Sequence, residues 1–502
     1  MYPFPIGPQA APPPPMPPPP RPPLREADPV AAVAGNATML GLGYMLMRRP
    51  ILAAVALCGT GFLVWSAAVQ VGNPLWRFLL PAWGLAMIVH AWWLTRRTVP
   101  SPLVDPSGAV RRLRFFAGTA AALVLLSLGW FRIDAWWTVR DAEAAQAAGR
   151  CEDAVAALGT LDAVHRVAFG PITTRADEER EACGILLAAL EEEPSEAAAG
   201  IADYLEHPGA LWDGAGPERA ALLLEAAAAG GALDLTDVGN AFAQLESTLD
   251  EHPGQAGAVR EVVEAFTADL AGMPPCHGYA ADHWLAEQDW DAPELAEPVA
   301  AAAADAPVRT LRCGQEWADG GDLEAAAALY REFLTEYPEH ELAAEAADGV
   351  LDTGSYCADP VAYTGAPAYS GRGPHPMRLQ GTTSEDRGFP AGWLGDDAAG
   401  TELVVCVTAE VGDFQESCRY QRSDGSLLWV TFYAHQFDIT AYELRTGEAV
   451  ADYSRQIGKA CPDTMDNTYS TIYFSSYGDF MSLASEYTDA EFRAMFSDIV
   501  GA

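Results

Sequence analysis

The residue whose setting most suggests chemistry is His375, which stands between two prolines in the glycine-rich segment 369–376. Histidine titrates near neutral pH, so a rigidly held histidine can act as a general base or bind a metal ion. A loop histidine that bonds to a backbone carbonyl is the alternative and the commoner arrangement. We therefore define a candidate functional loop by Tyr369, Arg372 and His375, and we assign no catalytic residue.

Elsewhere the sequence lacks the local patterns of known catalytic sites. It contains no G-x-S-x-G, no H-E-x-x-H, no P-loop and no calcium-loop spacing. Cys276 and His277 precede Asp282 and His283, as in a metal site. A disulfide from Cys276 to Cys313 would account for the cysteine instead, and no C-x-x-C pair occurs. We expect no metal and no cofactor, and enzymatic activity stays an open question.

Eight of the nine cysteines follow Asp134, and Cys58 lies in an apolar run. An even number of cysteines in one part of a chain is typical of disulfides in an oxidising compartment. Two pairs would each join neighbouring helices, namely Cys151 with Cys183 and Cys276 with Cys313. The other four cysteines allow three pairings, which stay open here: Cys357, Cys406, Cys418 and Cys461.

Charge divides the 502-residue chain into two unlike parts. The net charge is −39 overall, but residues 1–133 carry +8 and residues 134–502 carry −47. Proteins that bind nucleic acid need a basic face to neutralise phosphates, so this balance excludes that class. The acidic part is expected to stay soluble at high density, to attract polycations and to associate weakly with divalent cations.

Three apolar runs lie in the basic part, at residues 50–69, 78–94 and 115–130. Their lengths of 16 to 20 residues match a hydrocarbon core about 30 Å thick, and none contains a charged side chain. Eight of the 14 tryptophans lie between Trp65 and Trp137, mostly near the ends of these runs. The sequence therefore predicts an integral membrane protein with spanning helices at about 50–69, 77–95 and 114–132.

The placement of arginines predicts how the chain is oriented in the bilayer. Two clusters precede the first run and separate the second run from the third: Arg48 and Arg49, then Arg96, Arg97, Arg111, Arg112 and Arg114. By the positive-inside rule both clusters are cytoplasmic, so the chain after Asp134 is extracellular. Residues 1–28 form a proline-rich, disordered tail that we also place in the cytoplasm, as a polyproline docking peptide or an inert tail.

Residues 29–46 form a shorter apolar segment, which Asp28 would cap and Pro29 would begin. The segment could span the membrane, or it could be a short re-entrant or interfacial helix, which we favour. The string Gly-Leu-Gly-Tyr-Met-Leu-Met-Arg-Arg at 41–49 resembles the short hairpins of small bacterial two-helix membrane modules.

Residues 134–352 are rich in Ala, Leu and Glu, with apolar residues at helical spacing. The unit 321–338 has a glycine at its turn, a small residue at the helix contact, two core aromatic residues and a terminal proline. These are Gly321, Ala326, Tyr330, Phe333 and Pro338. The pattern resembles the second half of a tetratricopeptide repeat, and residues 142–158 are similar. The resemblance implies three to five helical hairpins, serving as a groove for a protein or peptide or as a rigid spacer.

After residue 352 the composition shifts to Gly, Pro, Tyr and Thr with strand-like alternation. Strands are predicted at 402–409, 426–434, 437–444 and 448–454. Thr488 and Glu491 predict a capping box that opens a terminal helix. We expect a small α+β domain over 353–502 with two disulfides. The pieces Cys418-Arg-Tyr, Leu444-Arg-Thr-Gly and Cys461-Pro are similar to uncharacterised secreted domains of high-GC Gram-positive bacteria.

Together these features predict a multi-domain chain: a transmembrane α-helical anchor over 29–133, an extracellular tetratricopeptide-like array and a C-terminal disulfide-tied α+β domain. The chain resembles bacterial membrane-anchored envelope proteins with such repeats, of unknown function. We expect a binding or scaffold protein of the cell envelope with a protein or peptide partner outside the cell. The alternatives are an extracellular hydrolase acting on wall substrates through His375, or a sensor that relays to the proline-rich tail.

Overall fold

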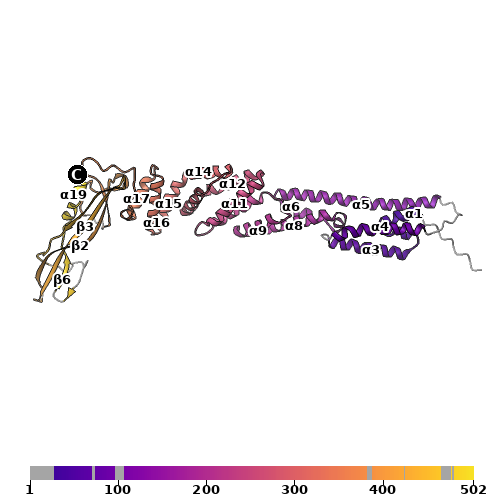
Figure 1. Ribbon diagram of the computed structural model, residues 1–502, viewed down its shortest axis with the longest axis horizontal. Coiled ribbons are helices and arrows are strands. Elements are labelled where there is room, and N and C mark those ends of the chain that lie inside the picture. Colours follow the sequence, from indigo (N-terminus) through magenta and orange to yellow (C-terminus); the bar gives the residue numbers. More distant parts are fainter. Residues whose placement is uncertain are drawn as a thin grey trace, which may run out of the picture. The chain divides into compact units, whose positions relative to one another are not determined.

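The computed structural model describes residues 28–70, 74–96, 107–381, 387–422, 424–464, 476–477 and 480–501. The expected tail at 1–28 lies outside the described residues except for Asp28. The protein is mostly helical and has a sheet region near its C-terminus (Figure 1). It divides into two compact units, one ending at Ala215 and the other beginning at Gly216. The predicted helical array is therefore shared between the units.

Three helices in the first unit are long and apolar enough to cross a membrane, as predicted. They are α3 (Pro50–Val69), α4 (Pro74–Arg96) and α5 (Ser107–Ala147). At 1.5 Å per residue, the 20 residues of α3 span about 30 Å. Helix α5 extends beyond the predicted spanning segment at about 114–132 and continues to Ala147. Residues 133–147 contain neither proline nor glycine and are rich in alanine, so nothing local ends the helix.

The segment before α3 forms a short hairpin of two helices, α1 (Pro29–Ala37) and α2 (Leu42–Leu46), neither long enough to span a bilayer. Its turn packs against α4 through a buried asparagine. The Asn36 amide nitrogen donates to the Met87 carbonyl at 3.2 Å, and its oxygen accepts from the Tyr44 backbone N–H at 3.2 Å. Both polar ends of this buried side chain are thereby satisfied.

The first unit has four further helices, α6 (Cys151–Leu158), α7 (Ala163–Ala168), α8 (Gly170–Ala189) and α9 (Pro194–Glu206). Of these, α6, α7 and α8 pack on the second half of α5, and α9 packs on α8. Helix α10 (Ala215–Ala228) begins at the last residue of this unit and continues into the second. The turn from α5 to α6 uses Gly149, whose φ is 75°, and Ala154 and Leu158 of α6 are buried. The apolar helix α5 thus becomes the first packing partner of the helices that follow it.

The helices of the second unit pack in a regular way. Their bounds are α11 (Leu235–Glu251), α12 (Ala256–Asp269), α13 (Pro275–Ala286), α14 (Pro293–Ala302), α15 (Ala306–Asp319), α16 (Leu323–Glu336) and α17 (Ala343–Asp352). Helix α12 packs on α14 and α13 on α15, while α15, α16 and α17 pack in succession. Alternating contacts of this kind form a layered helical stack.

The predicted unit 321–338 corresponds to α16 and the turn that joins it to α15. Gly321 makes the turn with a φ of 84°, and Ala326 and Phe333 are fully buried. The Tyr330 ring fills a slot between two other glycines. A Cβ added at Gly314 or Gly349 would lie 2.6 or 2.5 Å from that ring. Pro338 follows two residues after the end of α16. The five residues therefore lie where a tight antiparallel pair needs them.

The C-terminal sheet has the strand order β1-β2-β3-β6-β5, and β4 pairs with β3. The strands are β1 (Met377–Gln380), β2 (Leu403–Gln421), β3 (Leu427–Glu443), β4 (Ala449–Ile457), β5 (Ser476–Tyr477) and β6 (Phe480–Ala484). The prediction of separate strands at 426–434 and 437–444 is wrong. They are one strand because β3 gains consecutive partners, β6 over residues 429–433 and then β4 over 435–442. Strand β1 was not predicted.

Two short helices, α18 (Asp489–Ala494) and α19 (Ser497–Val500), cover a core formed by β1, β2 and β3. Phe492 and Phe496 are fully buried in this core. The capping box before α18 is present as predicted: Thr488 N–H donates to Glu491 at 2.7 Å, and Glu491 N–H donates to the Thr488 hydroxyl at 3.3 Å.

Candidate functional site

Helices α13 to α16 line an open pocket of about 440 Å³ within the second unit. Its most distinctive side chains are two tyrosines and three carboxylates: Tyr279, Tyr337, Asp282, Glu332 and Glu336. They come from two helices that are remote in sequence, α13 and the end of α16. The pocket therefore exists only because α15 packs on both of those helices.

A tyrosine orients one of the pocket carboxylates. The Tyr279 hydroxyl lies 2.9 and 2.8 Å from the two oxygens of Glu332, and it donates to that carboxylate. Burial and this hydrogen bond both raise the pKa of Tyr279, so the hydroxyl keeps its proton. The Glu332 carboxylate is thereby fixed in position at the pocket wall.

The second carboxylate, Asp282, is already neutralised. The Arg309 guanidinium binds it through two nitrogens and also donates to the Ala302 carbonyl at 2.6 Å. Both side chains are almost buried, with exposures of 7% and 12%. Burial raises the pKa of Asp282, and Arg309 opposes that effect. This pair is a structural element of the wall and contributes no net charge to the pocket.

The remaining charge of the pocket is negative. Neither Glu332 nor Glu336 forms an ion pair with an arginine or lysine of the described chain, and the rim carries Glu287 with His283 at 3.7 Å. Carboxylates bind guanidinium and ammonium groups, and tyrosine rings add attraction for the same cations. The pocket is thus suited to a cationic side chain or a small organic cation.

The candidate loop lies elsewhere, beside the C-terminal helices. The His375 side chain is buried, its Nδ1 lies 2.6 Å from Glu402, and its ring packs edge-on against Tyr369 at 4.5 Å. The backbone N–H of His375 donates to the backbone carbonyl of Val500 at 2.9 Å. Arg372 is exposed and does not join this cluster. The ring therefore binds a carboxylate and not the backbone carbonyl that was the expected alternative. Glu402 directly precedes β2 and Val500 ends α19, so the two contacts connect the loop to both elements.

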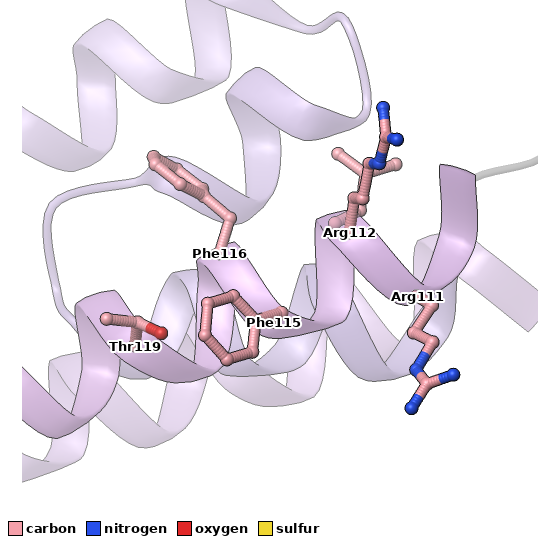
Figure 2. A pocket seen from close by; sticks show the side chains of 6 residues that line it. Arg111, Arg112, Phe115, Phe116 and Thr119 are labelled. Carbon is pink, nitrogen blue, oxygen red and sulfur yellow. The ribbon is translucent and has the colours of Figure 1, made fainter. Parts of the chain in front are cut away.

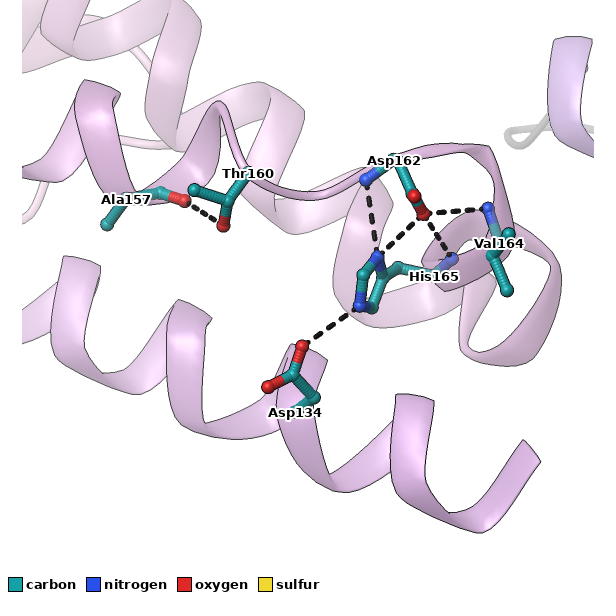
Figure 3. Close-up of polar contacts among 6 residues, drawn as sticks. All are labelled: Asp134, Ala157, Thr160, Asp162, Val164 and His165. Atoms are coloured by element: carbon teal, nitrogen blue, oxygen red, sulfur yellow. Dashed lines mark hydrogen bonds and ion pairs between the residues drawn. The ribbon is translucent and has the colours of Figure 1, made fainter. Parts of the chain in front are cut away.

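A second histidine, which the sequence interpretation missed, lies where α7 meets α5 (Figure 3). His165 is bonded through Nδ1 to Asp162 at 2.8 Å and through Nε2 to Asp134 of α5 at 3.1 Å. Asp162 also caps α7 by accepting from the Val164 N–H. The D-x-x-H spacing of a capping box was the available signal for this contact.

A buried carboxylate in the first unit was missed as well. Glu179 of α8 accepts from Arg175 at 2.9 Å, and Arg175 also pairs with Glu143 of α5 at 2.9 Å. The other Glu179 oxygen is buried and without a partner among the described residues. Burial, with Glu143 nearby, raises the pKa of Glu179 to about 7.

The cysteines after Asp134 form four disulfides. Cys151–Cys183 and Cys276–Cys313 pair as proposed from the sequence, and the open choice resolves into Cys357–Cys406 and Cys418–Cys461. The one described group with metal-ligand geometry is Glu416 with Cys418 and Cys461, whose two sulfurs form a disulfide.

Sequence motifs did not indicate the acidic pocket, because Tyr279 and Glu332 are 53 residues apart. Its charge pattern is nevertheless visible in hindsight, since Glu332, Glu336 and Tyr337 occupy one stretch of α16 without an arginine on the same side. Comparison with known proteins found no family model, no curated relative and no solved structure that matches this chain.

Proposed function

We propose that the protein is a membrane-anchored scaffold of the cell envelope that binds a cationic side chain of a partner protein in the pocket formed by α13 to α16. The observation that carries this proposal is the pocket itself, in which tyrosines and uncompensated carboxylates face one cavity. A cation is bound most strongly where two carboxylates lie close together and are partly shielded from water.

The envelope location rests on two features of the chain. One arginine cluster precedes the first apolar helix and the other lies between the second and the third, whereas residues 134–502 carry a net charge of −47. This distribution favours an extracellular array and C-terminal domain. Four disulfides after Asp134 are typical of an oxidising compartment. The proline-rich tail would then be cytoplasmic.

The scaffold role is supported by the way the helices join. Helix α5 runs without a break from its apolar half into the half on which α6, α7 and α8 pack. The first helices of the tetratricopeptide-like array would therefore be held at the membrane surface without a flexible linker. Arrays of paired helices commonly present such grooves to extended peptides.

A binding experiment on the full chain in nanodiscs tests the pocket. The probe is a short blocked peptide with a single arginine, titrated by calorimetry at low salt. We expect Glu332→Gln with Glu336→Gln to weaken binding at least about tenfold, which corresponds to about 1.4 kcal/mol. The matched control is Glu246→Gln with Glu261→Gln, which removes the same charge from exposed helix positions.

Three outcomes decide the proposal. Loss of binding in the pocket variant alone supports it. Equal loss in both double variants would show that bulk charge attracts the peptide, and no binding to the unaltered protein would remove the pocket as a recognition site. A matched lysine peptide then distinguishes a preference for guanidinium from a preference for ammonium.

A further inference from the structure

We propose that the first turns of α5 form a binding site for the headgroup of an anionic phospholipid. The site is an open cavity of about 800 Å³ beside the first turns of the helix. It is lined by Arg111, Arg112, Phe115, Phe116 and Thr119, together with Leu113 (Figure 2). The inference does not depend on the cation pocket.

Within the described part of the chain, two of the three arginines in this stretch form no ion pair. Arg114 binds Asp28 at 2.6 and 3.1 Å, and that contact ties the start of α1 to α5. Arg111 and Arg112 are exposed and form no ion pair within the described chain. The structure thus leaves two guanidinium groups for an external anion.

The two arginines are each followed one turn later by a phenylalanine on the same side of the helix. Arg111 and Phe115 point one way, and Arg112 and Phe116 point the other way (Figure 2). Phe115 and Phe116 are 77% and 60% exposed. A guanidinium fork matches the geometry of phosphate oxygens, and an exposed ring beside it suits the upper part of an acyl chain.

The depth of the site in the bilayer is consistent with a lipid headgroup. Arg112 precedes Arg132 by 20 residues, which is about 30 Å of helix and equals the thickness of a hydrocarbon core. Trp136 and Trp137 follow Arg132, as expected for the opposite interface. Arg111 and Arg112 are therefore level with phosphate groups when the apolar part of α5 crosses the membrane.

The test measures lipid retained by the full chain after transfer from vesicles containing equal amounts of phosphatidylglycerol and phosphatidylcholine. Native mass spectrometry counts the bound molecules. We expect a preference for phosphatidylglycerol of at least threefold, which Arg111→Gln with Arg112→Gln abolishes. The control is Arg140→Gln with Arg150→Gln, which removes equal charge beyond the apolar part of α5 and should keep the preference.

The proposal is overturned if the unaltered protein shows no preference, a result that does not depend on the variant folding. It is overturned as well if both double variants lose the preference equally. Added inorganic phosphate should not displace the lipid, and displacement would identify a site for free phosphate instead.

Discussion

The pocket of the second unit and the first turns of α5 offer opposite charges in opposite settings. In each region one ion pair is internal, Asp282 with Arg309 in the pocket and Asp28 with Arg114 at α5. In each, two like charges remain, Glu332 and Glu336 in one case and Arg111 and Arg112 in the other. The difference lies in the internal pair, because Arg309 is 7% exposed whereas Arg114 is 53% exposed.

The same kind of ion pair has different consequences in the two regions. A buried pair cannot lose one partner without leaving a desolvated charge, whereas an exposed guanidinium is replaced by water. The pocket should therefore be sensitive to its internal pair, and the surface of α5 should be sensitive mainly to what binds it from outside.

The largest effect is expected from Arg309→Gln. It leaves the carboxylate of Asp282 almost buried and without its cation, so we expect a loss of about 3–5 kcal/mol in the free energy of unfolding. Chemical denaturation followed by far-UV circular dichroism measures it. A loss below about 1 kcal/mol would show that solvent reaches Asp282.

The next effect concerns Glu179, a buried carboxylate whose arginine partner is half exposed. Its pKa in the folded protein is raised to about 7, so the folded state holds the proton more tightly than the unfolded chain does. Protonated Glu179 contributes up to about 3 kcal/mol to the free energy of unfolding. This contribution is fully present below the pKa of the unfolded chain and is lost as the pH rises through about 7.

Thermal unfolding of the unaltered protein and of Glu179→Gln, from about pH 5 to about pH 8, measures this dependence. The variant cannot ionise, so its stability should fall less with rising pH. Parallel curves for the two proteins would contradict the assignment of the titration to Glu179.

A smaller effect is expected from Gly349→Ala, which disturbs the packing of α16, the helix that carries Glu332. The added methyl group meets the Tyr330 ring, so we expect a loss of about 1–3 kcal/mol in stability and weaker peptide binding. The control is Gly257→Ala in α12, where an added Cβ has nothing within 4 Å. An equal loss of peptide binding in both variants would show that binding in the pocket does not depend on the packing of α16.

The smallest effect is expected from Arg114→Gln. The Arg114 side chain is 53% exposed, whereas Asp28 is 4% exposed. Asp28 keeps the hydrogen bond from the Val30 N–H, and water can reach the side from which Arg114 approaches, so the loss of stability should be smaller than that of Arg309→Gln. Differential scanning fluorimetry in nanodiscs measures it. A loss as large as that of Arg309→Gln would remove the distinction between the two regions.

Much of the fold could be predicted from local sequence. The apolar runs indicated three membrane-length helices, and the capping box at Thr488 is present. The pairs Cys151–Cys183 and Cys276–Cys313 were anticipated because each joins helices close in the chain. The pairing of Cys357 with Cys406 could not be chosen, since it depends on where β2 lies relative to the loop after α17.

Other features were beyond local pattern. The join of two expected strands into β3 depends on β4 and β6, which supply partners from later in the chain. The carboxylate beside His375 was not foreseen, because Glu402 lies 27 residues further on. The acidic pocket likewise needed the packing of α13 and α16 against α15.

Composition and spacing alone determined that this chain has a basic, apolar part with three long helices and an acidic part that is largely helical and then strand-forming. Those properties depend on residues that are neighbours in sequence, whose periodicity and charge act locally. Only the tertiary structure decided which charges are compensated. Arg309 neutralises Asp282 and leaves Glu332 and Glu336 open, because ion pairing depends on distance in space and on the water that packing removes.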